Sequence, residues 1–386
     1  LLLSIQPVTT DLYLPALPAL TRDLSASVAA GQLTLSALLL AFGCSQLVWG
    51  PLSDRFGRRP VLLAGLAIYT LASLGSAFAP SMALLIAWRI AQGAAMGAVV
   101  MCARAIVRDL YTPLTGARAM SKALTGLGLV ACVCAPLGGL LTVWLGWRAA
   151  LLALTGYAVL TLALVALRMP ETLARPNPQA LQPGVLLRTW GTVLRHPTFW
   201  AFSLLTTAAY GGLFTFLAAS SFVFIEVLGL SRTQYGWVLL STALAYFVGT
   251  FVCRYLLARH GLRRTVALAG ALSLSGGTLM ALVAWAGWHQ PWALLAPFYL
   301  FMLGHGIHQP CGQSGAVGPF PQAAGVASAL NGFMMMLAAF AMGGWVGAHL
   351  DGSIWPLING VGFWSVLLAA IAWTLVQQFG EPRERP

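Results

Sequence analysis

Two charged side chains stand inside long apolar stretches of this sequence, where a charge is costly. Asp11 lies in the middle of one apolar run and Arg89 lies inside another. Charged residues within membrane helices usually mark ion pathways or proton relays. Burial favours a neutral acid and a nearby arginine favours the carboxylate, so Asp11 could exchange protons near neutral pH. The pair predicts a proton-coupling site, and the alternative is a static Asp11–Arg89 pair that only packs helices.

The C-terminal half has polar side chains in similar positions but no comparable acid. His305 and His308 are three residues apart, so they share one helix face, and Asn331 stands in another apolar run. These residues could contact a substrate, and a histidine could also be a second proton site. The alternative is a set of structural histidines with satisfied hydrogen bonds. Two histidines without a third ligand do not predict a metal site.

An adaptable apolar pocket is a further possibility in this half. Tyr210, Phe214 and the run Met334–Met336 are of the types that suit promiscuous binding. In a bundle of membrane helices, however, such residues more often face lipid or pack in the core. We therefore treat Tyr210 and Phe214 as candidate substrate contacts, with core packing as the alternative.

The sharpest motif in the sequence is the charged segment Gly50–Arg59, which reads GPLSDRFGRR. Its glycines permit close helix approach and a sharp turn, and its acid can pair with the basic groups. Such a cluster would suit a conformational latch, and the alternative is a positively charged anchor at the membrane surface. A weaker copy of its R-x-G-x-R pattern occurs at Arg259–Arg263. The candidate latch residues are Gly50, Asp54, Arg55, Gly57, Arg58 and Arg59.

The elements that would position these residues are membrane helices. Of 386 residues, 59% are hydrophobic and only 8% charged, and the mean hydropathy is +0.82. These values exclude an ordinary soluble enzyme and a disordered protein, and the thin spread of basic residues argues against a nucleic-acid binder despite the net charge of +12. A spanning helix needs about 20 apolar residues. Twelve such spans are predicted: 1–21, 32–50, 60–79, 82–107, 116–142, 147–168, 198–228, 233–258, 264–287, 291–316, 324–349 and 355–378.

The longest polar stretch divides the spans into two sets of six. Residues 169–197 predict a cytoplasmic linker between an N-terminal bundle, 1–168, and a C-terminal bundle with a short tail, 198–386. Most Lys and Arg residues fall on one side of the predicted spans. The positive-inside rule then places both termini in the cytoplasm.

Five segments of the sequence resemble one family of transporters. Gly50–Arg59 matches the G-x-x-x-D-R-x-G-R-R signature of the major facilitator superfamily, and Arg89–Gly93 resembles its R-x-x-Q-G motif. The segment Asp11–Pro18 (DLYLPALP) is similar to the first span of its Bcr/CflA-type drug:proton antiporters, as are the segments Arg104–Tyr111 and Pro170–Leu173. The fifth span departs from the family's G-P-x-x-G-G pattern, because it reads Ala-Pro-Leu-Gly-Gly.

The resemblance implies an all-α membrane protein of twelve transmembrane helices in two pseudo-symmetric six-helix halves. It implies proton-coupled multidrug efflux of small amphipathic compounds by alternating access, with a role in antibiotic resistance. Asp11 and Arg89 would handle the proton, Asp11, Tyr13 and Gln92 would contact substrate, and Gly50–Arg59 would be an inter-helix latch. The departure in the fifth span weakens the case for strict antiport.

The expected partners are a small-molecule drug, protons and the lipid bilayer, with no nucleic acid, cofactor or metal. The expected location is a bacterial inner membrane, as a monomer. No catalytic motif or phosphate-binding loop occurs, so we expect no enzyme activity. The alternatives are a proton symporter or facilitator of a small metabolite on the same fold, a membrane receptor that transports nothing, and an intramembrane enzyme.

Overall fold

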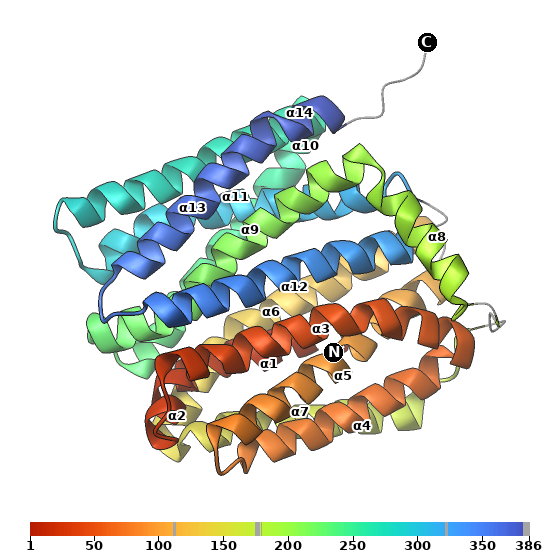
Figure 1. Cartoon of the computed structure of the whole chain (residues 1–386), viewed down its shortest axis with the longest axis horizontal. Coiled ribbons are helices and arrows are strands. Elements are labelled where there is room, and N and C mark those ends of the chain that lie inside the picture. The colour runs from red at the N-terminus through yellow and green to blue at the C-terminus, as the bar shows by residue number, and fades with distance from the viewer. Residues whose placement is uncertain (111–112, 174–177, 179, 321–322, 381–386) are drawn as a thin grey trace. The chain divides into compact units, whose positions relative to one another are not determined.

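The computed structural model describes residues 1–110, 113–173, 178, 180–320 and 323–380 (Figure 1). The regular secondary structure of these residues is helical. Within these described ranges, nine helices are long and apolar enough to cross a membrane, judged by length and composition. One of them contains two of the predicted spans. The two remaining predicted spans correspond to the interrupted first span and to α11, so the twelve-span fold is confirmed.

The first span is not the continuous helix that we predicted for residues 1–21. It consists of α1 (Ile5–Asp11), the short 3₁₀ helix η1 (Leu14–Ala16) and α2 (Leu17–Asp23). Pro15 and Pro18 follow the break, and a proline has no N–H for the helical ladder and clashes with the preceding turn. Hydropathy alone predicted the length of this span and missed its interruption directly after Asp11.

Five long helices complete the first unit. They are α3 (Val28–Phe56), α4 (Arg58–Ala77), α5 (Met82–Leu110), α6 (Pro113–Leu145) and α7 (Trp147–Arg168). Helix α5 packs against α3 and α4, α7 packs against α4, and α1 and η1 lie against α6. The interrupted first span is therefore held against α6 by packing, with its broken end at the residues that the sequence singled out.

The polar stretch 169–197 contains a helix that we did not predict. Helix α8 (Pro183–Leu194) is short and amphipathic, with Val193 buried and Leu187 exposed. Its apolar residues are too few for a membrane span, so a search for long apolar windows passes over it.

The second unit is built around α9. Its helices are α9 (Pro197–Phe222), α10 (Arg232–Trp285, which belongs to this unit from Val238 onward), α11 (Pro291–Val317), α12 (Ala324–His349), α13 (Trp355–Trp373) and α14 (Leu375–Phe379). Helix α9 packs against α11, α12 and α13 and continues into a single turn of π-helix, η2 (Val223–Val227). Helix α10 contains both the eighth and the ninth predicted spans, separated at Gly261 by non-helical backbone.

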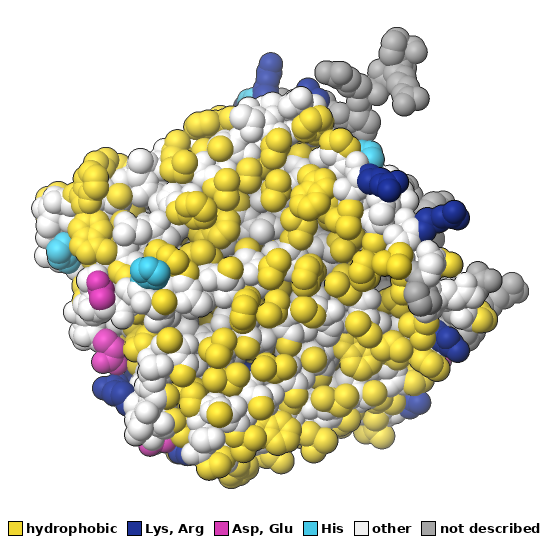
Figure 2. Space-filling view, viewed as in Figure 1, with side chains coloured by type: hydrophobic (Ala, Val, Ile, Leu, Met, Phe, Trp, Pro, Cys, Tyr) yellow, Lys and Arg dark blue, Asp and Glu magenta, His cyan; other side chains and the backbone are white. Residues whose placement is uncertain are grey.

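Contacts divide the chain into two compact units. One comprises Leu1–Arg188 with Ser231–Trp237, and the other comprises Thr189–Leu230 with Val238–Pro386. Figure 2 shows hydrophobic side chains spread over the visible face, with charged side chains at its margins. That distribution is typical of a protein whose surface faces lipid.

Candidate functional site

Arg89 is the centre of a buried polar cluster in the first unit. Its side chain is fully buried on α5, and its Nη1 donates to Gln92 Oε1 at 2.6 Å. Its Nη2 donates to the Thr9 carbonyl at 3.3 Å, and its guanidinium carbon lies 4.2 Å from the centre of the Tyr13 ring. The Tyr13 hydroxyl in turn pairs with Thr34 Oγ1 at 2.7 Å. A hydrogen bond, a backbone carbonyl and an aromatic face thus hold one cation in place.

A second layer joins this cluster to α4. Gln92 Nε2 donates to Ser73 Oγ at 2.7 Å, and the Tyr69 hydroxyl pairs with Thr9 Oγ1 at 2.6 Å. Arg89 Nε, by contrast, is buried without a hydrogen-bond partner. The cluster therefore connects α1, α3, α4 and α5, and it leaves one donor of its cation unused.

The break in the first span explains why Arg89 can reach α1. In an uninterrupted helix the Thr9 carbonyl would accept the backbone N–H of Tyr13. Here the Tyr13 N–H donates to the Thr10 carbonyl at 3.2 Å instead. The Thr9 carbonyl is then left to the arginine, so the interruption of the helix supplies a ligand for the cation.

Asp11 is the last residue of α1 and is partly buried. Its carboxylate accepts a hydrogen bond from Thr10 Oγ1 at 2.8 Å. Among the described residues no ion pair joins Asp11 to Arg89, so the structure does not contain the direct pair that we considered. Arg89 instead contacts the turn that carries Asp11. Gly138, from the departing motif of the fifth span, approaches the Leu12 carbonyl so closely that a Cβ atom there would collide with it.

The second unit contains an uncharged polar cluster. His305 Nδ1 lies 3.1 Å from the Ala209 carbonyl, and the ring centres of His305 and Tyr246 are 5.5 Å apart. His308, one turn further along α11, is fully buried, and neither of its ring nitrogens has a hydrogen-bond partner of good geometry. One ring nitrogen of His305 therefore has a backbone partner, whereas His308 has no hydrogen bond of good geometry at either ring nitrogen.

Asn331 belongs to the same unit. Its Oδ1 accepts a hydrogen bond from Thr206 Oγ1 at 2.7 Å, and Gln309 Nε2 donates to the Thr206 carbonyl at 3.3 Å. Thr206 therefore links three helices, α9, α11 and α12. The sequence analysis did not single it out, because a threonine in an apolar run carries no distinctive signal.

The aromatic candidates of this half differ in how far they are buried. Phe214 is fully buried in α9, as core packing requires, whereas Tyr210 is partly exposed. Met335 and Met336 are buried on α12.

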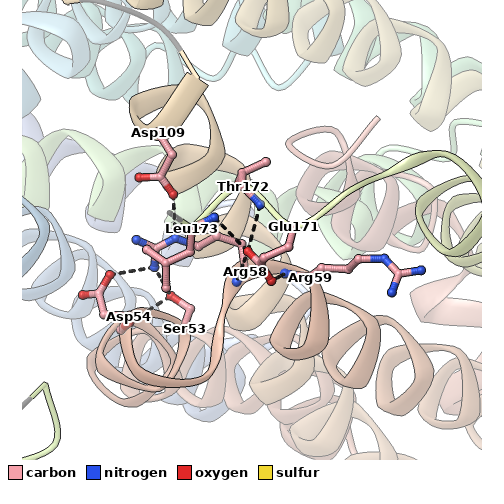
Figure 3. A network of polar contacts seen from close by, with 9 residues as sticks. Ser53, Asp54, Arg58, Arg59, Asp109, Glu171, Thr172 and Leu173 are labelled. Carbon is pink, nitrogen blue, oxygen red and sulfur yellow. Dashed lines mark hydrogen bonds and ion pairs between the residues drawn. The ribbon is translucent and has the colours of Figure 1, made fainter. Parts of the chain in front are cut away.

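The latch segment, Gly50–Arg59, comprises the C-terminal end of α3, the turn at Gly57 and the start of α4 (Figure 3). Arg58 is almost fully buried, with 1% of its surface exposed. It pairs with Asp54 Oδ1 at 2.6 Å and with Asp109 Oδ2 at 2.8 Å, and it donates to Ser53 Oγ at 2.7 Å. Because the cation is buried and paired with two acids, the turn is tied to the end of α5.

Glu171 holds the other side of the turn (Figure 3). Its carboxylate accepts the backbone N–H groups of Arg58 at 2.9 Å and Arg59 at 3.0 Å, and so binds at the first turn of α4. It also accepts the N–H groups of Thr172 and Leu173. Burial acts to raise the pKa of Glu171, but these hydrogen bonds outweigh it and hold the pKa below its ordinary value.

The two glycines of the latch segment play different roles. Gly57 has φ 103° and ψ 157°, a conformation open essentially to glycine alone, and a Cβ there would lie 2.5 Å from Glu171 Oε2. Gly50 lies within α3, where a Cβ would come no closer than 3.6 Å to the Met101 methyl group. The close approach that we expected at Gly50 occurs instead at Gly93, which abuts the Leu38 carbonyl.

The other latch residues extend this arrangement. Arg59 Nε donates to the Met169 carbonyl at 2.8 Å and its Nη2 to the Ala166 carbonyl at 3.0 Å, which ties the turn to the end of α7. Arg55 is exposed and lies 5.5 Å from the centre of the Phe56 ring. Asp109 and Glu171 lie outside the latch segment in the sequence, and no local pattern links them to it.

Apolar helices in two units, with buried charge in the first, define a membrane transporter rather than a soluble binding protein. The chain belongs to the Major Facilitator Superfamily, whose sequence model matches residues 1–344. A bacterial homologue of the human lysosomal transporter Spinster, in its inward-facing and occupied conformation, has the same fold. The two structures superpose with a TM-score of 0.73 at 14% sequence identity. The superposition covers 100% of this chain and 97% of that one.

Several curated relatives are bacterial resistance proteins. Multidrug resistance protein D of Escherichia coli is 34% identical over 335 residues, covering 86% of this chain and 83% of that protein. The chloramphenicol resistance protein of Pseudomonas aeruginosa is 30% identical over 373 residues, covering 95% and 82%. The bicyclomycin resistance protein homologue of Haemophilus influenzae is 26% identical over 357 residues, covering 92% and 89%.

Proposed function

We propose that this chain exports small amphipathic drugs from a bacterial cell, driven by protons that move inward. The observation that carries the proposal is Asp11, an acid at the broken end of α1, beside a turn whose backbone binds the buried Arg89. The names of the relatives support drugs as the substrate class. The protein would lie in the inner membrane with both termini in the cytoplasm.

The proposed coupling works through the charge of Asp11. As a carboxylate, Asp11 accepts a hydrogen bond from the Thr10 hydroxyl group. In this charged form it also attracts a cationic or polar drug. Once protonated it is neutral, loses that attraction and releases the drug. Arg89 stays charged and holds the turn through the Thr9 carbonyl, so it positions Asp11 without carrying the proton itself.

Alternating access would expose the site to each side of the membrane in turn. We propose that residues 1–168 and 198–386 are the moving halves and that 169–197 is their linker. The latch segment would stabilise one of the two states, because its buried cation depends on contacts with α5 and with Glu171. In the second half, Tyr210, His308 and Asn331 would complete the substrate contacts.

Drug flux in proteoliposomes under an imposed pH gradient tests this proposal. The parent should accumulate a cationic drug against its gradient while protons move the opposite way. Asp11→Asn should abolish accumulation yet permit downhill flux, because the amide cannot exchange the proton. Asp351→Asn, an exposed acid hydrogen-bonded to the Ser353 N–H, is the matched control and should behave as the parent.

Three outcomes would contradict the proposal. Purely downhill flux in the parent would favour a facilitator, and drug and protons moving in the same direction would favour a symporter. Full coupling in Asp11→Asn would show that Asp11 is structural.

A further inference from the structure

Helices α10 and α11 meet along a close seam in the second unit. The Tyr299 hydroxyl donates to Ser241 Oγ at 2.8 Å near one end of the seam. Further along, Gly249 and Gly306 bring the two backbones together, since a Cβ on Gly306 would lie 2.5 Å from the Tyr246 carbonyl oxygen. Both helices advance in the same direction along this seam, and small residues allow the approach.

Two cysteines face each other just beyond the glycine crossing. The Sγ atoms of Cys253 on α10 and Cys311 on α11 are 3.7 Å apart, although 58 residues separate them in the sequence. The two residues are 2% and 1% exposed, and both are free thiols. The fold therefore holds two thiols side by side in an apolar interior.

The separation of the two sulfur atoms suits a shared ligand. Two thiolates on one tetrahedral metal ion, with bonds of about 2.3 Å, have sulfurs about 3.8 Å apart. A pyramidal trivalent centre has a narrower angle and draws its two sulfur ligands somewhat closer, which a small side-chain shift of this pair would allow. No group of three or more His, Cys, Asp or Glu side chains that could hold a metal ion occurs among the described residues. The pair lacks the further ligands that a structural zinc ion needs.

We propose that Cys253 and Cys311 form a dithiol site for trivalent organoarsenic compounds. A monosubstituted arsenic atom keeps its carbon group and takes two sulfur ligands, which is what this pair offers. In the reaction with an organoarsenic oxide, two As–S bonds form and the arsenic–oxygen bond breaks. The oxygen leaves as water with the two thiol protons, and arsenic remains trivalent, so no oxidant is needed. Capture joins α10 to α11.

The other cysteines of the chain provide controls. Cys132 and Cys134 are two residues apart on α6, a spacing that points side chains to different faces of a helix. Cys44 is exposed on α3 and Cys102 is buried on α5. A compound that requires two adjacent thiols should therefore distinguish Cys253 and Cys311 from these four.

The test is phenylarsine oxide binding to the purified full chain, measured by intact-mass spectrometry under native conditions. We expect one arsenical per chain, removed by a small dithiol and resistant to a monothiol. Cys253→Ser and Cys311→Ser should each weaken retention by about 100-fold or more, because the second As–S bond forms intramolecularly. The double variant Cys132→Ser/Cys134→Ser should bind as the parent does.

Two results would overturn the site: unchanged retention in both single variants, or loss of retention in the Cys132→Ser/Cys134→Ser control. Because a serine variant could fold poorly, the unsubstituted protein gives an independent measurement. When the protein is then unfolded in dodecyl sulfate so that its buried thiols become accessible, bound phenylarsine oxide should protect Cys253 and Cys311 from maleimide labelling and leave the labelling of Cys44 unchanged. Labelling of both seam cysteines at the untreated rate would equally refute the proposal.

Discussion

The turn at Gly57 and the turn at Gly261 have a similar backbone bend, but different side-chain contacts stabilise them. Both follow the pattern R-x-G-x-R, and both glycines adopt conformations that other residues avoid, with φ 103° and ψ 157° at Gly57 and φ 70° and ψ 179° at Gly261. The repeated pattern thus predicts the same local geometry in each half of the chain.

The surroundings of the two turns differ in charge. Arg58 has Leu262 as its counterpart, and Asp54 has Ala258. Where Glu171 binds the N–H groups of the first turn, the second receives a hydrogen bond from Gln377 Nε2 to the Arg263 carbonyl at 3.1 Å. A glycine pattern therefore sets the bend, while Asp109 and Glu171, which are distant in the sequence, help to make one copy a buried ionic network. We place the latch in the first half for this reason.

The largest predicted loss of stability follows substitution of Gly57, and it should exceed the loss at Gly261. Gly57→Ala combines backbone strain with the displacement of Glu171, and we expect a loss of about 4 kcal/mol in the free energy of unfolding. Gly261→Ala meets open space, so strain alone should cost about 2 kcal/mol. Unfolding in detergent micelles by added dodecyl sulfate, followed by circular dichroism, measures both. Equal losses would show that Glu171 does not depend on Gly57.

Replacing the buried cation should be the next largest effect. Arg58→Leu gives the first turn the residue type of the second and removes the ion pairs of Arg58 with Asp54 and Asp109. We expect a loss of about 3 kcal/mol, as for other broken buried ion pairs. Arg259→Leu is the control, since Arg259 is exposed and lies 4.9 Å from the centre of the Tyr255 ring, a contact of about 0.5 kcal/mol. Similar losses for both variants would remove the distinction between the turns.

The acid of the first turn should make stability depend on pH. The folded pKa of Glu171 is lowered, so its contribution is present above the unfolded pKa and is lost as pH falls through the folded pKa. Glu171→Gln should cost about 1 kcal/mol at pH 7, after allowance for solvent screening. Between pH 7 and pH 3 the variant should lose less stability than the parent. Parallel pH profiles would contradict this assignment.

The smallest effect is expected at the second turn. Gln377→Ala removes the hydrogen bond to the Arg263 carbonyl, which is worth about 0.5 kcal/mol for a neutral partner at a partly exposed site. The same unfolding assay measures it. A loss as large as that of Arg58→Leu would mean that Gln377 fixes the second turn as firmly as the acids fix the first.

Hydropathy predicted most of the fold because every helix that spans the lipid bilayer needs about 20 mostly apolar residues. Helix α12, for example, occupies residues 324–349 as predicted. The rule failed at the first span, since mean hydropathy does not register the missing N–H groups of Pro15 and Pro18. It also passed over α8, whose apolar residues are too few to cross a bilayer.

The sequence identified several residues of the candidate sites, but it did not predict which atoms these residues contact. Asp11 and Arg89 stand out because charges are rare in apolar spans, yet the Thr9 carbonyl that binds Arg89 becomes available only through the break in the helix. Asp109 and Glu171 lie far along the sequence from Arg58. Their partnership depends on helix packing, which no local pattern encodes. The Cys253–Cys311 pair has the same origin.

The interruption of the first span also has a consequence for synthesis of the protein. Segments of seven residues, α1 and α2, are shorter than the continuous apolar helix that partitions readily from the insertion machinery into lipid. Helix α3, with 29 residues, meets that requirement and packs against α2. We therefore expect the first two spans to enter the bilayer together as a helical hairpin. The broken segment that carries Asp11 would remain in the translocation channel until the ribosome has synthesised α3.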